Sequence, residues 1–319
     1  MTDDTAALTI VPAAPLAVAP QIDAGLLTGR IAPNTLRAYT GDFTAYASYA
    51  QSAGLPLTDS LTLARWRNQM IAESTYSPNT INRRLKAVRK IMTEAALERL
   101  ISREQAEAFK DVQGVSEKAL RNRTRPNART LITPDDMRRI CDAPDTATLK
   151  GLRDQALLLT LASSGLRCSE LAGLTVGQLI KISKGKYMLT GIVGKADSLD
   201  MPRSAYISAE AFQACQRWLG ARPFLSQTLF TSLQGRGRAE QATDKALSSV
   251  AVWQLVQEYA QTVGLAHIKP HDFRRFTATE IIKKHDVRAA QKALGHKSIS
   301  TTSKYDLSGL EPGLTDDLF

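Results

Sequence analysis

The basic segment RNRTRPNART interrupts the chain at residues 121–130. It holds four arginines and a proline and has no acidic residue. Proline and a polar run favour an extended linker over a helix or a buried strand, and the charge favours a linker that lies along a polyanion. The segment therefore divides the 319 residues into two domains, each long enough for a hydrophobic core of its own.

Composition sets the boundaries around this linker. Residues 1–28 are rich in Ala and Pro and lack aromatic residues, so we expect a flexible lead-in. An all-helical domain is predicted over 29–112, followed by the basic interdomain linker at 113–130. The second domain is predicted over 131–319, with a C-terminal tail from about residue 306.

Helical periodicity is typical of the first domain. After Pro33, apolar residues recur every three or four positions, at Leu36, Tyr39, Phe43, Tyr46 and Ala50. Ser77 and Pro78 form a second helix start, with serine as the N-cap and proline in the first turn. The apolar face of that helix is predicted to consist of Ile81, Leu85, Val88 and Met92.

Five basic residues lie on other sides of the same predicted helix, with no acid among them: Arg83, Arg84, Lys86, Arg89 and Lys90. A solvated surface is one interpretation. A run of positive charge without acids favours contact with the phosphates of a nucleic acid. We extend that prediction to Arg121, Arg123 and Arg125 of the linker.

The second domain reads as mainly helical with one short stretch of sheet. Thr133 and Pro134 form a helix start, and residues 151–165 predict a buried helix that ends at Gly165. Residues 186–208 are the one clear strand–turn–strand region, with β-branched and aromatic residues on both sides of a polar turn. Further helices are predicted at about 209–221, 246–263, 270–285 and 287–294.

Charge and cysteine usage restrict the class of protein. Lys and Arg outnumber Asp and Glu by 41 to 31, a formal charge of +10 that favours a polyanionic partner. No apolar run approaches the ~18 residues of a membrane span, and the acidic, proline-broken start does not resemble a secretory signal. Three widely spaced cysteines, Cys141, Cys168 and Cys215, form neither a disulfide framework nor a cysteine zinc site. We expect a soluble cytoplasmic protein that binds nucleic acid.

Four segments of the second domain carry groups suited to a phosphodiester. Arg167 follows the helix-ending Gly165, and Lys195 follows Gly194 in the strand–turn region. His271 and Arg274 share one face of a helix, and His296 and Tyr305 lie near the C-terminus, with Tyr305 expected on a short helix. Each alone is more often a surface charge, a helix cap or a packed aromatic residue. Their combination is what indicates chemistry.

That combination resembles the tyrosine recombinase (phage integrase) family. The matching motifs are SSGLRCSEL at 163–171, HDFRRFTAT at 271–279 and LGHKSISTTSKY at 294–305, in the family's order and spacing, together with Gly194-Lys195 in a β-hairpin. The resemblance is strong over about 131–310 and looser over 30–112. It implies a mainly α fold, with a helical N-terminal core-binding domain and a mostly α catalytic domain that contains a small antiparallel sheet.

The resemblance also implies a reaction. Tyr305 would attack DNA and form a 3′-phosphotyrosine link, with neither metal nor cofactor. Arg167 and Arg274 would hold the non-bridging oxygens, His271 and His296 would bind the same phosphate, and His271 would also take the nucleophile's proton. Lys195 would be the general acid, with Lys184 and Lys186 as weaker candidates. Four protomers would act on two specific double-stranded DNA sites through a four-way junction, with no membrane involved.

Several features depart from the family pattern. The turn after Lys195 lacks the extra basic residues of many relatives, with Arg203 as the nearest substitute, and Arg275 stands where many relatives have His. The acidic tail carries Leu310, Leu314, Leu318 and Phe319, which either dock on a neighbouring protomer or fray.

The short lead-in favours a simple two-domain, nucleoid-associated enzyme for integration, excision or dimer resolution, serving a chromosome, a plasmid or a mobile element. Two alternatives are a catalytically silent DNA-binding protein of the same fold and a relaxing enzyme similar to type IB topoisomerases.

Overall fold

The computed structural model describes residues 22–73, 75–116, 118–120, 132–194, 202–234, 241–303 and 305. Contacts within the chain divide it into two units, Met1–Ala128 and Arg129–Phe319. Lys195, Arg121, Arg123, Arg125 and the leucine-containing tail, for which roles are predicted above, lie outside the described residues.

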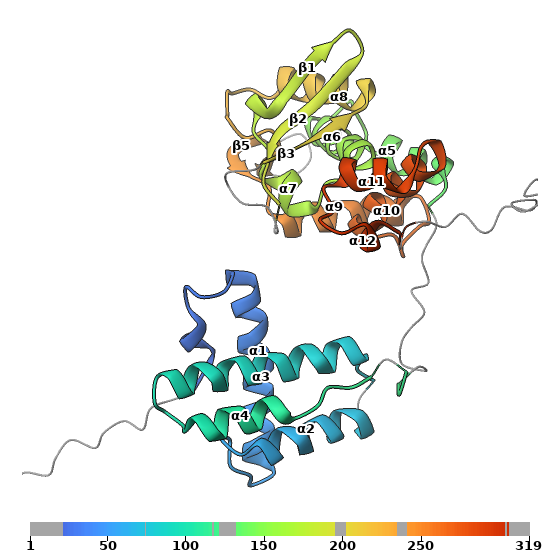
Figure 1. The fold of residues 1–319 in the computed structure, drawn as a ribbon. Coiled ribbons are helices and arrows are strands. Elements are labelled where there is room, and N and C mark those ends of the chain that lie inside the picture. The colour runs from blue at the N-terminus through green and yellow to red at the C-terminus, as the bar shows by residue number, and fades with distance from the viewer. Residues whose placement is uncertain are drawn as a thin grey trace, which may run out of the picture. The chain divides into compact units, whose positions relative to one another are not determined.

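The described part of the first unit is helical. Its elements are η1 (Ala24–Leu27), α1 (Pro33–Ser52), α2 (Ser60–Glu73), α3 (Pro78–Leu97) and α4 (Arg103–Asp111). The predicted cap of α3 is confirmed, because the Ser77 side chain accepts a hydrogen bond from the Thr80 N–H. The predicted apolar face is confirmed as well, since Ile81, Leu85, Val88 and Met92 are fully buried. Helix α3 packs against α1, α2 and α4 (Figure 1).

The second unit is built around α6 (Leu149–Ser164), which is buried on nearly every side. It packs against α5 (Pro134–Asp142), α8 (Ala209–Ala221), α10 (Pro270–Lys284) and strand β3 (Arg203–Ile207). Its second half, ALLLTLA at 156–162, is almost wholly apolar, as expected of a helix segment in a core. As predicted, α6 ends at Gly165, which has the left-handed conformation. The remaining helices are α7 (Cys168–Ala172), η2 (Val176–Gln178), α9 (Ser249–Thr262), α11 (Val287–Leu294) and α12 (Ile299–Ser303).

Three antiparallel strands, in the order β1-β2-β3, form the larger sheet. Strands β2 (Lys186–Ile192) and β3 confirm the predicted strand–turn–strand region, with Leu189 opposite Ala205 and both side chains facing the core. In Figure 1, β1 (Leu179–Ser183) lies at the outer edge of the unit, whereas β3 contacts α6 and α11.

Three strands were not predicted: β1 and the antiparallel pair β4 (Thr231–Gln234) and β5 (Gln241–Ala246). The first, LIKIS, is only five residues long and lies at an edge. The other two, TSLQ and QATDKA, are short and polar, and such residues have low strand propensity. Their pairing follows from tertiary context. The predicted mainly α architecture with a small antiparallel sheet is otherwise what the second unit adopts.

The end of α6 gives a stability prediction. Gly165 (φ 61°) has a Cβ position only 2.6 Å from Leu294 Cδ2, whereas Gly185 (φ 76°), in the turn between β1 and β2, faces open space. We expect Gly185→Ala to cost about 1 kcal/mol for the left-handed backbone, and Gly165→Ala to cost a further ~1–3 kcal/mol from overpacking. Urea titrations would measure both free energies of unfolding. Equal losses in the two variants would contradict the packing argument.

Candidate active site

Three helix boundaries of the second unit bring the predicted site residues together. Gly165 and Gly295, both with positive φ, end α6 and α11 and redirect the chain, so that Arg167 and His296 follow directly after a turn. Pro270 occupies the first turn of α10, which places His271 and Arg274 at the start of that helix. Tyr305, near the C-terminus, joins the group through its hydrogen bond to His271.

Arg274 is the most deeply buried member of the site. It is only 1% exposed, and its Nη1 and Nη2 donate to the carbonyls of Gly165 (2.6 Å) and Leu294 (2.7 Å). Burial, together with the nearby Arg167 guanidinium, lowers the pKa of Arg274 to about 10. The group therefore stays positively charged at neutral pH.

Arg167 is held by a carboxylate. Its Nη1 donates to Glu170 Oε1 (2.5 Å), and its backbone N–H donates to Glu170 Oε2 (2.9 Å), so Glu170 caps α7. Burial alone raises the pKa of the Glu170 carboxyl. The Arg167 N–H and the Arg203 and Arg167 guanidinium groups outweigh burial and hold that pKa below its usual value. Glu170 is therefore an anion that anchors Arg167, while the Arg167 side chain remains 39% exposed.

Tyr305 and His271 are hydrogen-bonded, with 3.2 Å between Oη and Nε2. The Tyr305 backbone is fixed by its N–H to the Thr302 carbonyl (2.8 Å) and by its carbonyl, which accepts from Thr279 Oγ1 (3.1 Å). The prediction that Tyr305 lies on a short helix is wrong, because α12 ends at Ser303 and Tyr305 lies in the turn beyond it. That turn directs the hydroxyl toward α10.

Both site histidines are held in the neutral form in the resting protein at neutral pH. His271 keeps an exposed edge, but desolvation of its ring and the guanidinium groups of Arg275 and Arg274 lower its pKa. Burial, together with Arg274 and Arg167, lowers the pKa of His296 to about 4. His296 Nδ1 is 2.9 Å from Thr302 Oγ1, and its ring centroid is 5.7 Å from that of Tyr305. A neutral His271 can accept a proton from the tyrosine hydroxyl.

A cavity of about 350 Å³ opens beside these groups. It is lined by Leu166, Arg167, Cys168, Trp253, Lys269, Pro270, His271 and Arg274. The lining combines cationic and hydrogen-bonding side chains with apolar ones. Such a lining suits a phosphate group attached to a larger, partly apolar molecule.

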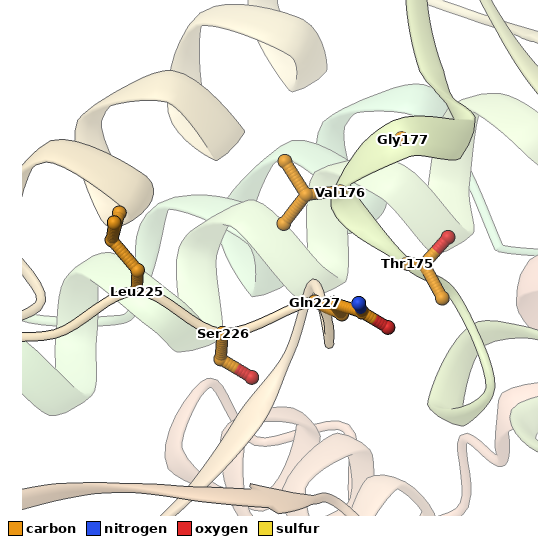
Figure 2. A pocket seen from close by; sticks show the side chains of 6 residues that line it. All are labelled: Thr175, Val176, Gly177, Leu225, Ser226 and Gln227. Carbon is orange, nitrogen blue, oxygen red and sulfur yellow. The ribbon is translucent and has the colours of Figure 1, made fainter.

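A second hollow of about 510 Å³ lies away from this chemistry, where the segment after α8 passes η2 (Figure 2). Its lining residues are Thr175, Val176, Gly177, Leu225, Ser226 and Gln227. None of these six side chains is titratable. Among the residues that the structure describes, no three His, Cys, Asp or Glu side chains are grouped to hold a metal ion, and no described helix is long and apolar enough to cross a membrane.

Other predicted site residues have different surroundings. Lys184 and Lys186 are exposed at the β1–β2 turn.

On α3, Arg83 and Arg84 form ion pairs with Asp42, Lys90 pairs with Glu94, and Arg89 donates to the Val112 carbonyl. Lys86 is exposed, and within the described ranges it has no ion pair. The pairing with Asp42 could not be predicted from the sequence, because that carboxylate lies 41 positions from Arg83.

The contact between Arg203 and Glu170 was not predicted from the sequence either. Arg203 Nη2 donates to Glu170 Oε2 (2.7 Å), so this arginine of β3 reaches the same carboxylate as Arg167. The only sequence signal was its place as the nearest basic residue after the hairpin turn.

Comparison with known proteins assigns the family. A model of the phage integrase family matches residues 130–308, which is more than half of the chain. The unit is mainly helical, and the arginines, histidines and tyrosine of the matched motifs lie together in it. The chain belongs to the phage integrase family.

The relatives carry consistent names. Over 180 residues the chain is 33% identical to tyrosine recombinase XerD of Neisseria meningitidis serogroup B, an alignment that covers 56% of this chain and 58% of that protein. Over 290 residues it is 31% identical to tyrosine recombinase XerC of Chromohalobacter salexigens, covering 88% and 87%. The solved structure of XerH site-specific recombinase bound to difH substrate has a TM-score of 0.60 at 18% identity, covering 85% of this chain and 76% of that one, and shares the fold.

The lowered pKa of His296 gives a pH prediction. Between about pH 6.5 and the folded value of about 4, the unfolded chain binds a proton at His296 that the folded chain does not. We therefore expect stability to fall as the pH falls through this window, and to fall less in His296→Gln. Urea unfolding at pH 7.5 and pH 5 measures this difference. Exposed His267 provides the control, and a His267→Gln variant that loses as much pH dependence would contradict the assignment.

Proposed function

We propose that this protein is a site-specific DNA recombinase that cleaves and rejoins DNA strands through a covalent 3′-phosphotyrosine at Tyr305. The observation that carries the proposal is the hydrogen bond between the Tyr305 hydroxyl and His271, beside the Arg167 and Arg274 guanidinium groups. A nucleophile, a neutral base and two cations for a phosphate are together in one place. The names of the relatives, tyrosine recombinases XerC and XerD, support the same activity.

The cleavage step assigns each group a role. Tyr305 Oη attacks phosphorus while its proton passes to His271 Nε2, in the tautomer that carries hydrogen on Nδ1. Negative charge grows on the non-bridging oxygens, where Arg167 and Arg274 provide charge-assisted hydrogen bonds. The bond from phosphorus to the 5′ oxygen breaks, and Lys195 donates a proton to that oxygen.

Rejoining reverses these transfers. A free 5′-hydroxyl from a partner strand attacks the phosphotyrosine, and the proton returns to Tyr305. Because the covalent link keeps the energy of the broken bond, ATP is not required. His296 would bind the phosphate beside Arg274. Its hydrogen bond to Thr302 through Nδ1 fixes the ring, so in the tautomer that carries hydrogen on Nε2 it can donate to a phosphate oxygen without rearrangement.

Arg274 is suited to this work because its position is fixed before DNA arrives. The backbone carbonyls of Gly165 and Leu294 accept hydrogen bonds from it, which uses two of the five N–H donors of a guanidinium. The desolvation cost of the cation is met during folding and need not be met during the reaction.

The proposal extends to the assembly. Four protomers would act on two DNA sites through a four-way junction, with the tail residues Leu310, Leu314, Leu318 and Phe319 docking on neighbouring protomers. Lys86, the linker arginines and, to the extent that their partners release them, Arg83, Arg84, Arg89 and Lys90 would contact the DNA backbone. The enzyme would work in the cytoplasm at the nucleoid, in integration, excision or dimer resolution for a chromosome or a mobile element.

Tyr305→Phe tests the nucleophile. With nicked suicide duplexes tiled from DNA that flanks the gene, we expect the wild type to give a protease-sensitive, slowly migrating band on denaturing gels. The variant should give none, while its DNA affinity stays within roughly fivefold, because one neutral hydrogen bond contributes only about 1 kcal/mol.

Binding without an adduct from the wild type would instead favour a catalytically silent DNA-binding protein. Relaxation of supercoiled plasmid without sequence preference would favour a topoisomerase-like enzyme.

Lys195→Ala tests the general acid. We expect cleavage of a normal duplex to slow by ~10²–10⁴-fold, the usual contribution of a positioned proton donor. A duplex with sulfur in place of the bridging 5′ oxygen should restore the rate, because a thiolate leaves without a proton. Lys184→Ala and Lys186→Ala serve as matched controls. If either of them, and not Lys195→Ala, shows the sulfur rescue, the assignment of Lys195 is wrong.

A further inference from the structure

Arg203 lies inside the candidate active site although no matched motif contains it. It is the first residue of β3, and its side chain is only 11% exposed. One of its nitrogens, Nη2, donates to Glu170 Oε2 at 2.7 Å. Its Nε and Nη1 are buried, and in the described part of the chain they have no hydrogen-bond partner. Buried donors of a guanidinium without acceptors are costly, so they point to a group that is bound only when the site is in use.

Glu170 connects Arg203 to Arg167. Its Oε1 accepts from Arg167 Nη1 at 2.5 Å, while its Oε2 accepts from Arg203. Each arginine therefore restricts the carboxylate that holds the other. Since the Arg167 side chain is partly exposed and long, it would otherwise lose more rotamer entropy on binding a phosphate.

Arg203 also packs against the turn that carries His296. A Cβ atom built on Gly295 would lie 2.4 Å from Arg203 Cδ and 2.9 Å from Arg203 Nε. Only glycine at position 295 leaves room for this side chain. The guanidinium thus lies between Glu170 on one side and the residue before His296 on the other.

The net charge of the cluster is positive and therefore suits an anion. Three guanidinium groups, those of Arg167, Arg203 and Arg274, surround a single carboxylate, that of Glu170, and the lowered pKa values leave His271 and His296 neutral. Formally this leaves two positive charges in a partly buried site. A phosphodiester carries one negative charge and gains a second in the five-coordinate transition state, which matches that excess.

We propose that Arg203 is a positioning residue of the reaction centre, which fixes Arg167 through Glu170 and adds positive potential where negative charge develops on the scissile phosphate. The inference rests on the proposed function. It assigns to β3 a group that positions Arg167 and contributes positive potential at the phosphate, in addition to the residues of the matched motifs.

A neutral substrate separates this role from simple packing. In a methylphosphonate, a methyl group replaces one non-bridging oxygen, so the linkage is uncharged and gains less charge during cleavage. On a suicide duplex that the wild type cleaves, we expect Arg203→Met to lower single-turnover cleavage of the phosphodiester by ~10²-fold, the usual loss for one preorganised donor. On the matching methylphosphonate we expect a loss below ~10-fold.

Arg203→Lys keeps the charge but cannot form the planar fork, so its loss on the phosphodiester should fall between those of the wild type and Arg203→Met. Arg222→Met is the matched control. Arg222 is also a buried arginine of this unit, but it donates to the carbonyls of Thr228 and Ser226. We expect that variant to lose stability and to change both cleavage rates by the same factor.

The outcomes separate the two claims. No adduct from the wild type would overturn the proposed function and this inference with it. A wild-type adduct, with equal losses on both substrates in Arg203→Met, would overturn the inference alone and leave Arg203 a packing residue. If circular dichroism shows that Arg203→Met is unfolded, the ratio of the two losses is taken from Arg203→Lys, where a ratio of one has the same meaning.

Discussion

The hydrogen bonds of the buried Arg274 guanidinium are the interaction on which the candidate site of the second unit depends. The guanidinium donates hydrogen bonds to two carbonyls that lie at the C-terminal ends of different helices, Gly165 at the end of α6 and Leu294 at the end of α11. Such carbonyls lack partners within their own helix, and the helix dipole makes them partly negative. A cation is therefore stabilised there at much lower cost than in an apolar core. The same contact joins segments 129 residues apart in the sequence and orients Arg167 and His296, which follow those helix ends.

The electrostatics of the site follow from this arrangement. Arg274 and Arg167 are among the causes that lower the pKa values of His271 and His296. A site that must stabilise negative charge and also accept a proton needs cations that stay charged and a base that stays neutral. Placing histidines next to guanidinium groups provides both, because the charge that binds a phosphate also keeps the imidazole unprotonated.

How far the sequence could predict this structure depends on the range of each interaction. The Ser77 cap, the apolar face of α3 and the end of α6 at Gly165 are local, and all were predicted. Motif spacing also identified the residues that α10 and the two glycine turns bring together. The strands β4 and β5 were missed because short polar segments become strands only when a neighbour pairs with them, and β1 was missed because it is five residues long, mostly exposed and at the edge of the sheet. The turn at Tyr305 was read as helix because the helical pattern of 299–303 ends only two residues earlier. The Arg203–Glu170 contact spans 33 positions and has no periodicity to reveal it.

The ion pairs show why a basic sequence does not by itself locate a DNA surface. Among the described residues, four buried carboxylates each hold two cations: Asp42 holds Arg83 and Arg84, Glu94 holds Arg30 and Lys90, Asp154 holds Lys150 and Arg153, and Glu170 holds Arg167 and Arg203. In each group the carboxylate restricts side chains that would otherwise lose ~2 kcal/mol of rotamer entropy on binding, yet one net positive charge remains. Arg83 and Arg167 keep part of their surface exposed. An acid distant in sequence therefore need not cancel a basic cluster. It can hold the basic side chains in place for a polyanion, although it neutralises half of the positive charge of the cluster.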